Sequence, residues 1–422
     1  EVVAETLVSI ITRSFVQGEV TRVVAVKSGY VKKSLVKEPH DIAKEIRILS
    51  SLSHPCVIEL LSHEFKRTSS TLSFRMPFIP MTLAKLLCIP YFSPRPHESF
   101  SKPLRDTAAA SFLTLARSLI FQILSGVAYL HDPSRYIAHR DLKPTNMLVD
   151  SSGSLKLIDF GIAYREVDTE DERRRDTWPE GKADMYFEVG SGPYRAPELL
   201  FGPRQYDAVA CDLWSLGTII AEFFTTLHRR FVDEEGDDFD DEGKETDPTE
   251  AYILDKPREA WAQPEWERYT LFNGTRGDIG LAWSIFKTRG SPTKDNWPGR
   301  CFFLFITFTN LPDATKVNFI EASGVVLASL LPNLPDGDPG LENRETVHFP
   351  PHVAPPHASD LIHRFLVYPQ TRRLQASDAL KHPWFTSGPQ LLVPPCLQGV
   401  VPSAAVGIGG TTLSDHLRTF SY

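Results

Sequence analysis

The chain has 422 residues, of which 42% are hydrophobic and 23% charged, an ordinary balance for a globular protein that buries a large core. Its net charge is −8, but residues 233–250 hold eleven acidic residues against one lysine and contribute −10. The remainder is near +2, so we expect no nucleic acid among its partners. We interpret the acidic run as a solvated insert, with a docking surface for a basic partner as the alternative.

The cysteines and the terminal residues bear on the compartment. The five cysteines are scattered without CxxC spacing, which favours reduced thiols over disulfides or a zinc site. Residues 1–11 have neither the basic flank nor the apolar run of a signal peptide. The longest obvious apolar run, residues 301–308, is less than half of the roughly 20 residues that a membrane helix needs. We expect an intracellular monomer, in the nucleus and/or the cytoplasm, without a membrane partner.

Hydrophobic periodicity predicts strands first and helices afterwards. Residues 20–26 alternate toward a β-branched run that is typical of a strand, and residues 38–52 carry apolar side chains at helical spacing. Residues 71–79 predict another strand, and residues 111–131 predict a long core helix. We expect helices to dominate from there on. Residues 386–422 are rich in Pro, Gly and small side chains and predict a flexible tail.

Linked motifs occupy the middle of the chain: HRDLKPTN at 139–146, DFG at 159–161 and APE at 196–198, with VVAVK upstream at 23–27. Eighteen residues separate Asp141 from Asp159, enough for a loop and a hairpin that bring two carboxylates around one metal and phosphate centre. The motifs have the order and spacing of a eukaryotic protein kinase. A lone DFG would indicate little, but a chance match of all four is a poor alternative.

The resemblance to protein kinases implies an α+β, bilobal fold. Residues 1–79 would form a small, β-rich N-lobe, and residues 80–385 a larger, mainly helical C-lobe. Four segments are set aside as inserts, at 88–110, 165–184, 228–265 and 299–310.

The same resemblance implies ATP and Mg²⁺ as cofactors, a protein as substrate, and roles for the motif residues. Asp159 and Asn146 would hold Mg²⁺. Asp141 would accept the proton of the substrate hydroxyl, and Lys143 would steady the transferring phosphoryl group. The KPTN sequence within this motif favours serine or threonine over tyrosine as the acceptor.

Upstream, Lys27 would bind the α and β phosphates of ATP. The resemblance implies an ion pair between Lys27 and Glu45, which follows after eighteen residues as in the family. An exposed helical carboxylate is the alternative for Glu45, because the helix register alone does not show that it faces the cleft.

Adenine recognition falls to the backbone that follows the strand at 71–79. Alignment with the family places Met76 at the gatekeeper position and Pro77, Phe78 and Ile79 at the hinge. Pro77 lies where only a hydrogen-bond acceptor is required, so its missing N–H is tolerated. The residue that must donate is Ile79.

Three segments resemble the CMGC group, which includes cyclin-dependent and MAP kinases. They are YRAPELLFG at 194–202, CDLWSLGTIIAEFF at 211–224 and residues 271–299. Residues 188–208 look most like a fungal CDK-activating kinase, a single-chain type that phosphorylates the activation loop of cyclin-dependent kinases. We therefore expect cyclin-dependent kinases as substrates. Cyclin binding is doubtful, because residues 39–45 keep only the proline, the closing glutamate and one basic residue of the cyclin-binding helix.

Two alternative functions remain, a cyclin-partnered CDK-like kinase and a pseudokinase scaffold with impaired ATP binding. Pseudokinases usually lose one of the catalytic residues, whereas this chain keeps the set. The resemblance also implies two supporting contacts. Asp212 should hold the backbone of the catalytic loop, and Arg373 should pair with Glu198.

The activation segment departs from the family pattern. Counting back from APE, Tyr186 occupies the place of the activating threonine in cyclin-dependent kinases. A phosphate there would pair with Arg140, and an acid such as Glu188 or Glu180 could substitute for it. Our hypothesis is that activity does not require phosphorylation of this loop, with Thr177 as an alternative phosphosite.

Downstream in the same segment, Ser191 takes the place of the threonine that touches the catalytic aspartate and lysine. Pro193 replaces a usual aromatic residue, so proline-directed specificity is not expected. The resemblance also assigns Arg195, in the YRAPE sequence, to the substrate and activation segment.

The glycine-rich loop that covers the phosphates of ATP should fall at residues 5–10, where the sequence reads ETLVSI. Bulky side chains hinder the approach of backbone N–H groups to phosphate, so we expect weaker ATP binding rather than loss of chemistry. The first residue is not Met, and we interpret the gap as a truncated or misassigned N-terminus, with true loop degeneration as the alternative. The apolar run within 299–310 is either a buried segment or an artefact of the gene model.

Overall fold

The N-terminal part of the protein is one antiparallel sheet. The computed structural model describes residues 2–5, 10–16, 22–230, 265–297, 308–340, 354–387, 391–398 and 411–420. The sheet has the strand order β1-β2-β3-β5-β4. Its strands are β1 (Val2–Glu5), β2 (Ile10–Val16), β3 (Arg22–Tyr30), β4 (Ser62–Lys66) and β5 (Thr71–Pro77). Lys27 on β3 lies opposite Phe74 on β5.

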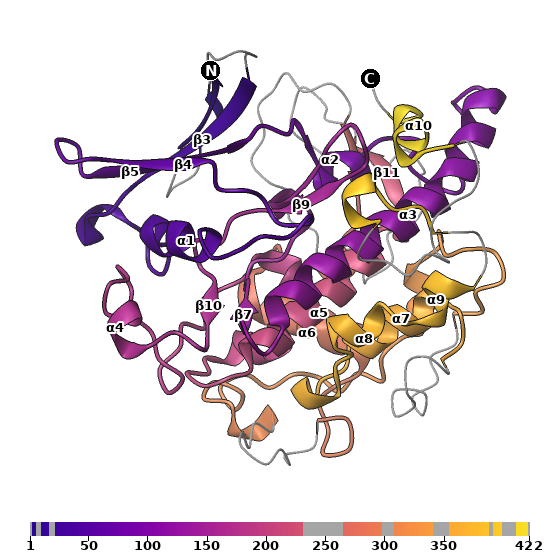
Figure 1. The fold of residues 1–422 in the computed structure, drawn as a ribbon. Helices are drawn as coiled ribbons and strands as arrows, with labels where there is room; N and C mark the ends of the chain where they lie inside the picture. Colours follow the sequence, from indigo (N-terminus) through magenta and orange to yellow (C-terminus); the bar gives the residue numbers. More distant parts are fainter. Residues whose placement is uncertain are drawn as a thin grey trace, which may run out of the picture.

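Helix α1 (Ile42–Leu49) follows β3 and packs beside the sheet (Figure 1). Asp41 caps its N-terminus by accepting hydrogen bonds from the backbone N–H groups of Ala43 and Lys44, which otherwise have no partner within the helix. Ile42, Ile46 and Leu49 belong to the hydrophobic core. Their spacing places the apolar stripe on one face, so that the opposite face is left for polar contacts.

Beyond β5, the described part of the chain holds more helix than strand, as predicted (Figure 1). Helix α3 (Lys102–His131) is long and apolar enough to cross a membrane, but 78% of its apolar window is buried inside the protein, as in a core helix. Next to it lies α5 (Ala208–Glu222), every residue of which is buried. The other α-helices in the described residues are α2 (Leu83–Leu87), α4 (Glu170–Arg173), α6 (Gly277–Arg289), α7 (Ala358–Phe365), α8 (Ala376–Ala379), α9 (Pro383–Thr386) and α10 (Leu413–Arg418).

Short strands frame the loops that carry the motifs. A three-stranded sheet has the order β6-β8-β9, and two further pairs are β7 with β10 and β11 with β12. The bounds are β6 (Met81–Thr82), β7 (Ile137–Ala138), β8 (Met147–Val149), β9 (Leu155–Leu157), β10 (Tyr164–Arg165), β11 (Leu227–Arg230) and β12 (Glu265–Arg268). The hairpin predicted between HRDLKPTN and DFG is β8 and β9.

The structure differs from our predictions at two places outside the motifs. The insert assigned to 88–110 contains the first two turns of α3, which begins at Lys102 because Pro103 is tolerated in the first turn of a helix. The tail, which we predicted to be flexible, contains buried side chains where it is described. Leu413, Leu417 and Phe420 are buried, and Phe420 packs against the rings of Tyr91 and Phe92.

Two predicted inserts lie mostly outside the described residues. Within 228–265, only residues 228–230 and 265 are described, and they belong to the paired strands β11 and β12. The interpretation of the apolar run at 301–308 falls outside the described residues except for Phe308. Phe308 packs against Phe201 and Phe286.

Candidate active site

Three charged side chains meet between the sheet, α1 and the DFG sequence. Lys27 Nζ on β3 lies 2.9 Å and 2.8 Å from the two carboxylate oxygens of Glu45 on α1. The same ammonium lies 2.7 Å from Oδ1 of Asp159. Glu45 is 2% exposed and also accepts a hydrogen bond from the backbone N–H of Phe160. The predicted pair of Lys27 with Glu45 is therefore present, and the alternative of an exposed Glu45 is wrong.

Within this cluster, Lys27 and Asp159 each favour the charged form of the other. Burial lowers the pKa of Lys27, but the carboxylates of Asp159 and Glu45 outweigh burial and raise it above its usual value. Burial raises the pKa of Asp159, but Lys27 outweighs burial and holds it well below its usual range. Lys27 is thus a cation and Asp159 an anion at neutral pH, the states in which they would bind phosphate and metal.

The catalytic loop forms a second cluster around Asp141. Ser191 Oγ donates to Oδ1 of Asp141 at 2.7 Å and accepts from Lys143 Nζ at 2.6 Å. Lys143 Nζ also lies 2.9 Å from Oδ2 of Asp141. Asn146 Nδ2 donates to the backbone carbonyl and to Oδ2 of Asp141, at 2.9 Å and 3.0 Å. The four side chains therefore occupy one site, with the carboxylate of Asp141 at its centre.

A buried carboxylate behind the loop fixes its backbone. Asp212 on α5 accepts hydrogen bonds from the backbone N–H groups of His139 and Arg140 at 2.7 Å and 2.8 Å. This is the contact that the family resemblance implied for Asp212. Arg140 and Asp159 both have positive φ angles, 63° and 69°, a backbone strain that such contacts hold in place at functional sites.

The residues predicted to bind adenine follow β5. Met76 is 5% exposed and lies opposite Ala25 of β3, at the inner end of the strand. Pro77 is the last residue of β5, and Phe78 and Ile79 are partly buried in the link to β6. Their position between the sheet and the helical part agrees with a hinge, and the role of Ile79 as donor to adenine remains a prediction.

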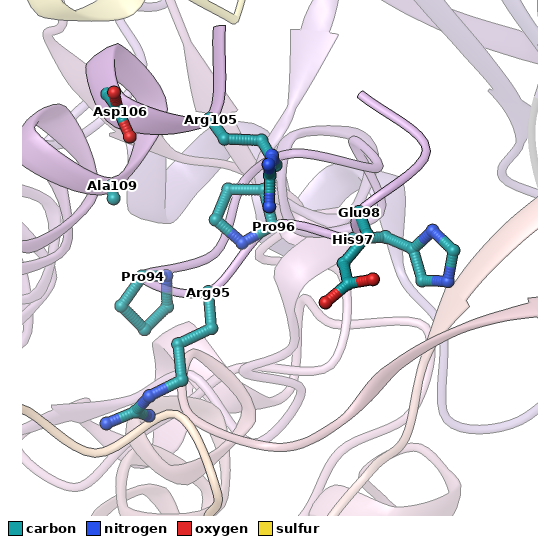
Figure 2. Close-up of a pocket in the computed structure, with 8 residues that line it drawn as sticks. All are labelled: Pro94, Arg95, Pro96, His97, Glu98, Arg105, Asp106 and Ala109. Carbon is teal, nitrogen blue, oxygen red and sulfur yellow. The ribbon is translucent and has the colours of Figure 1, made fainter. Parts of the chain in front are cut away.

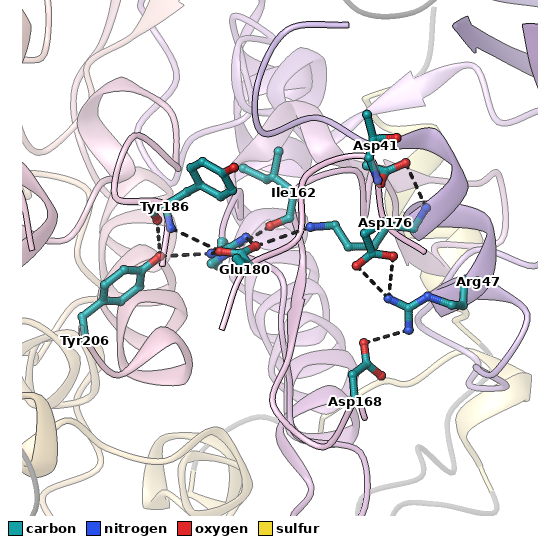
Figure 3. A network of polar contacts seen from close by, with 11 residues as sticks. Asp41, Arg47, Ile162, Asp168, Asp176, Glu180, Tyr186 and Tyr206 are labelled. Atoms are coloured by element: carbon teal, nitrogen blue, oxygen red, sulfur yellow. Dashed lines mark hydrogen bonds and ion pairs between the residues drawn. The ribbon is translucent and has the colours of Figure 1, made fainter. Parts of the chain in front are cut away.

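Glu180, one of the two acids that we considered as a substitute for a phosphate, pairs with Arg140. Its carboxylate is 2.8 Å from Nη1 of Arg140 and 2.5 Å from Nη2, and 3.4 Å from Nζ of Lys44 on α1. Tyr206 contacts the same guanidinium at 3.1 Å, and the backbone N–H of Tyr186 donates to Glu180 at 3.2 Å (Figure 3). All but Tyr186 are buried.

Glu188, the other acid that we considered as a substitute for phosphate, is exposed, so Glu180 is the residue that pairs with Arg140. Burial raises the pKa of Glu180, but Arg140 and Lys44 outweigh burial and lower it. Glu180 is therefore ionised at neutral pH and forms a charged contact between the catalytic loop and α1.

The end of the activation segment is tied to the helical part. Arg195 donates to the backbone carbonyl of Phe187 at 3.1 Å and forms an ion pair with Asp278 on α6. Gly190 has a φ of 80°, and a side chain there would lie 2.9 Å from Cγ of Arg195, so glycine is required. The predicted pair of Arg373 with Glu198 is present, with two contacts of 2.6 Å and 2.7 Å between fully buried groups.

The site has oxygen ligands that suit Mg²⁺. The described residues include no cluster of three or more His, Cys, Asp or Glu side chains that would hold a metal alone. Mg²⁺ is commonly bound by one or two carboxylates together with substrate phosphates, so a complete protein cage is not required. Within the described part of the chain, Oδ1 of Asn146 accepts no hydrogen bond, and the side chain of Asp159 is 36% exposed. The amide oxygen of Asn146 and the partly exposed carboxylate of Asp159 could therefore take part in such a site.

The predicted gap in the glycine-rich loop falls between β1 and β2. Strands β1 and β2 pair with Glu5 opposite Ile10, so the connection between them is residues 6–9. These residues lie outside the described part of the chain, and the expectation of weak ATP binding stays a prediction.

Sequence reasoning missed the contacts between α1 and the insert at 165–184. Arg47 on α1 binds Asp168 and Asp176, and Asp41 accepts from the backbone of Thr177 (Figure 3). The only signal was the charge of the insert, which does not specify a partner.

A separate hollow lies at the start of α3. Figure 2 shows an open cavity of about 590 Å³ lined by residues 94–98 and by Arg105, Asp106 and Ala109. Arg95 on its rim is held by the carbonyl of Pro332 at 2.6 Å and by Asp336. None of the residues of the catalytic motifs lines this cavity.

A paired lysine and glutamate, a DFG aspartate and an HRD aspartate in this arrangement define a protein kinase site. Residues 12–385 match the family described as Protein kinase domain, and the chain belongs to this family. The human protein "Cyclin-dependent kinase 20" is 30% identical over 312 residues, covering 72% of this chain and 64% of the human protein. "Probable cyclin-dependent kinase 10" of Dictyostelium discoideum is 26% identical over 376 residues, covering 88% of this chain and 73% of that protein.

These relatives place the chain among the cyclin-dependent-kinase-like members of the family and confirm that resemblance. The match spans 64% of the human relative and 59% of its zebrafish counterpart. A chain in the solved structure titled "Crystal Structure of the yeast RNA Pol II CTD kinase CTDK-1 complex" has a TM-score of 0.55 and 21% identity. The alignment covers 92% of this chain and 95% of that chain, and it shows that the fold is shared. The predicted bilobal, α+β kinase fold is therefore confirmed.

Proposed function

We propose that the chain is a serine/threonine protein kinase that transfers the γ-phosphate of ATP to a protein hydroxyl. The observation that carries the proposal is the linked set of Lys27, Glu45 and Asp159, next to the cluster around Asp141. Asp141 is the base for the substrate hydroxyl, and Lys143 balances the charge of the transferring group. The hydroxyl of Ser191 holds Asp141 and Lys143 together, which fits serine or threonine as acceptor.

Lys27 holds the α and β phosphates, and Glu45 keeps Lys27 in place. Mg²⁺ held by Asn146 and Asp159 would supply positive charge that neutralises the phosphates during transfer. The hinge after β5, at Pro77 and Ile79, is the proposed adenine site. Weak ATP binding through the altered phosphate loop is compatible with this chemistry, because the charged groups are all retained.

We further propose activation loops of cyclin-dependent kinases as substrates. The support is the likeness of residues 188–208 to CDK-activating kinases and the presence of Pro193 where proline-directed kinases of the group carry an aromatic residue. The test is transfer of radiolabelled phosphate from Mg-ATP to a catalytically dead cyclin-dependent kinase, with Asp141→Asn as the control. Equal labelling by the wild type and by Asp141→Asn would show that a contaminating kinase transfers the phosphate, and would refute the proposed substrate.

A cyclin-partnered kinase is the second candidate, because the relatives are named cyclin-dependent kinases. A pull-down of the purified chain with a panel of cyclins separates the two candidates. Stable cyclin capture together with activity only in the complex favours the second.

We also propose that the activation loop works without phosphorylation. The support is Glu180, which already pairs with Arg140 and Lys44. Phosphatase treatment should leave the rate of phosphate transfer unchanged, and loss of activity after treatment would contradict this proposal.

We also propose that the protein resides in a reducing compartment inside the cell. The support is that the four described cysteines are all free thiols.

A further inference from the structure

The charged insert of the activation segment lies along one face of α1. Asp41, Lys44 and Arg47 are spaced three residues apart and therefore share this face, whereas Glu45 points away from it toward Lys27. Each of the three residues on the shared face contacts the segment from Asp168 to Glu180 (Figure 3).

The contacts cover α1 from its beginning to its end. At the N-terminus, Oδ2 of Asp41 accepts from the backbone N–H of Thr177 at 2.6 Å, while Oδ1 caps the helix. In the last turn, Nη1 of Arg47 is 2.7 Å from Asp168, and Nη2 is 3.0 Å from both oxygens of Asp176. One guanidinium thus joins two carboxylates of the insert.

The pairs of Arg47 are not ordinary surface ion pairs. The side chains of Asp168 and Asp176 are 5% and 8% exposed, and that of Arg47 is 23% exposed. Exposed pairs contribute little, but buried pairs with several hydrogen bonds hold their partners firmly once formed. A planar guanidinium with two fixed carboxylates also constrains direction, because its donors form a rigid fork.

Helix α1 needs such a restraint. It has eight residues, fewer than the roughly 12 to 15 at which an isolated helix becomes stable in water, so tertiary contacts set its position. Glu45 reaches Lys27 only if α1 stays against the sheet and the DFG sequence, and Glu45 is one of the two carboxylates that hold Lys27.

We propose that the insert at 165–184 is a built-in clamp for α1, and that Arg47, Asp168 and Asp176 are positioning residues that keep Glu45 on Lys27. The inference rests on the proposed kinase function. It means that α1 is held in the position for catalysis by the chain itself, without a partner protein on this face of the helix.

The first test measures phosphate transfer by the full chain as a double-mutant cycle. Arg47→Ala should lower kcat/KM for ATP by roughly tenfold to hundredfold, as expected for the loss of charged hydrogen bonds. In a Glu45→Gln background, Arg47→Ala should have no further effect, because Arg47 acts through Glu45. Equal losses in both backgrounds would overturn the proposal. Arg174→Ala, which removes an exposed pair on α4, is the matched control and should leave the rate unchanged.

The second test follows hydrogen exchange and needs no activity. Amides of α1 should exchange about tenfold faster in Arg47→Ala and in the double variant Asp168→Asn, Asp176→Asn, while those of α3 stay protected and show that the fold is intact. Unchanged exchange of α1 would contradict the clamp. If the wild-type chain transfers no phosphate, the proposed function fails, and the exchange measurement still decides whether the clamp exists.

Discussion

The hydroxyl of Ser191 joins Asp141, the proposed base of the reaction, to Lys143. Ser191→Ala should lower kcat by roughly tenfold or more, because the hydroxyl bonds to two charged groups and each such bond contributes about 1.5–3 kcal/mol. Ser191→Thr retains the hydroxyl and should retain most of the rate. Steady-state kinetics of the two variants give the answer, and equal rates for Ala and Thr would rule out a role for the hydroxyl.

The buried pair of Arg373 and Glu198 is expected to stabilise the fold rather than the chemistry. Arg373→Ala leaves a carboxylate without its partner in a site that is closed to water, so the free energy of unfolding should fall by about 3–5 kcal/mol. Urea denaturation measures this loss. The neighbouring Arg372 is exposed, and Arg372→Ala should change the stability by less than about 0.5 kcal/mol. A similar effect of both substitutions would contradict the account.

At the scale of elements, the contact of Glu180 with Arg140 and Lys44 should give the protein a defined dependence on pH. The folded protein holds the pKa of Glu180 below its usual value of 4.5, so ionised Glu180 stabilises the folded state above that pH. This contribution is lost as the pH falls through the lowered pKa.

The prediction for Glu180 is tested by thermal unfolding between pH 3 and pH 7 with Glu180→Gln as the comparison. The melting temperature of the wild type should exceed that of the variant at pH 6 and 7, and the difference should shrink below about pH 4.5. A difference that stays constant or grows in acid would show that Glu180 is not a charged partner of Arg140.

The elements that carry the catalytic motifs could be predicted from the sequence, whereas contacts between distant elements could not. Catalytic residues lie in short motifs at fixed spacing, so the loop of Asp141, the hairpin β8 and β9 and the pair of Lys27 with Glu45 were all accessible from sequence. The contacts of Arg47 were not, because they join residues more than 120 positions apart. The charges in the sequence indicate which residues can form ion pairs, but they do not identify the partners. For this reason both Glu180 and Glu188 were candidates for the acid beside Arg140.

Secondary structure was misjudged where local composition and tertiary packing disagree. The first turns of α3 contain Pro103 and polar residues, and this composition is also typical of a loop. Residues 411–420 follow a stretch rich in glycine, yet they contain Leu413, Leu417 and Phe420, whose burial against the start of α3 and the preceding segment holds α10 in place.

At the scale of the whole molecule, the end of the chain should contribute to the stability of the helical part. Phe420 is 1% exposed and packs on Tyr91 and Phe92 at ring distances of 5.7 Å and 5.0 Å. Phe420→Ala should lower the free energy of unfolding by about 3–5 kcal/mol, because it opens a cavity in this cluster. Denaturant unfolding measures this free energy, with substitution of the exposed neighbour, Arg418→Ala, as the control. An unchanged free energy of unfolding in Phe420→Ala would show that this part of the tail does not stabilise the fold.

The arrangement of the whole molecule brings the sheet with Lys27, helix α1 with Glu45 and the loops with Asp141 and Asp159 into one site. The central claim is that this site transfers phosphate. The most direct measurement is the initial rate of phosphate transfer from radiolabelled Mg-ATP to a serine- and threonine-containing protein, by the wild type and by Asp141→Asn prepared in parallel. We predict transfer by the wild type and a rate lower by roughly 10²-fold to 10⁴-fold for the variant, which still binds ATP. Equal rates, or no transfer by the wild type, would contradict the account.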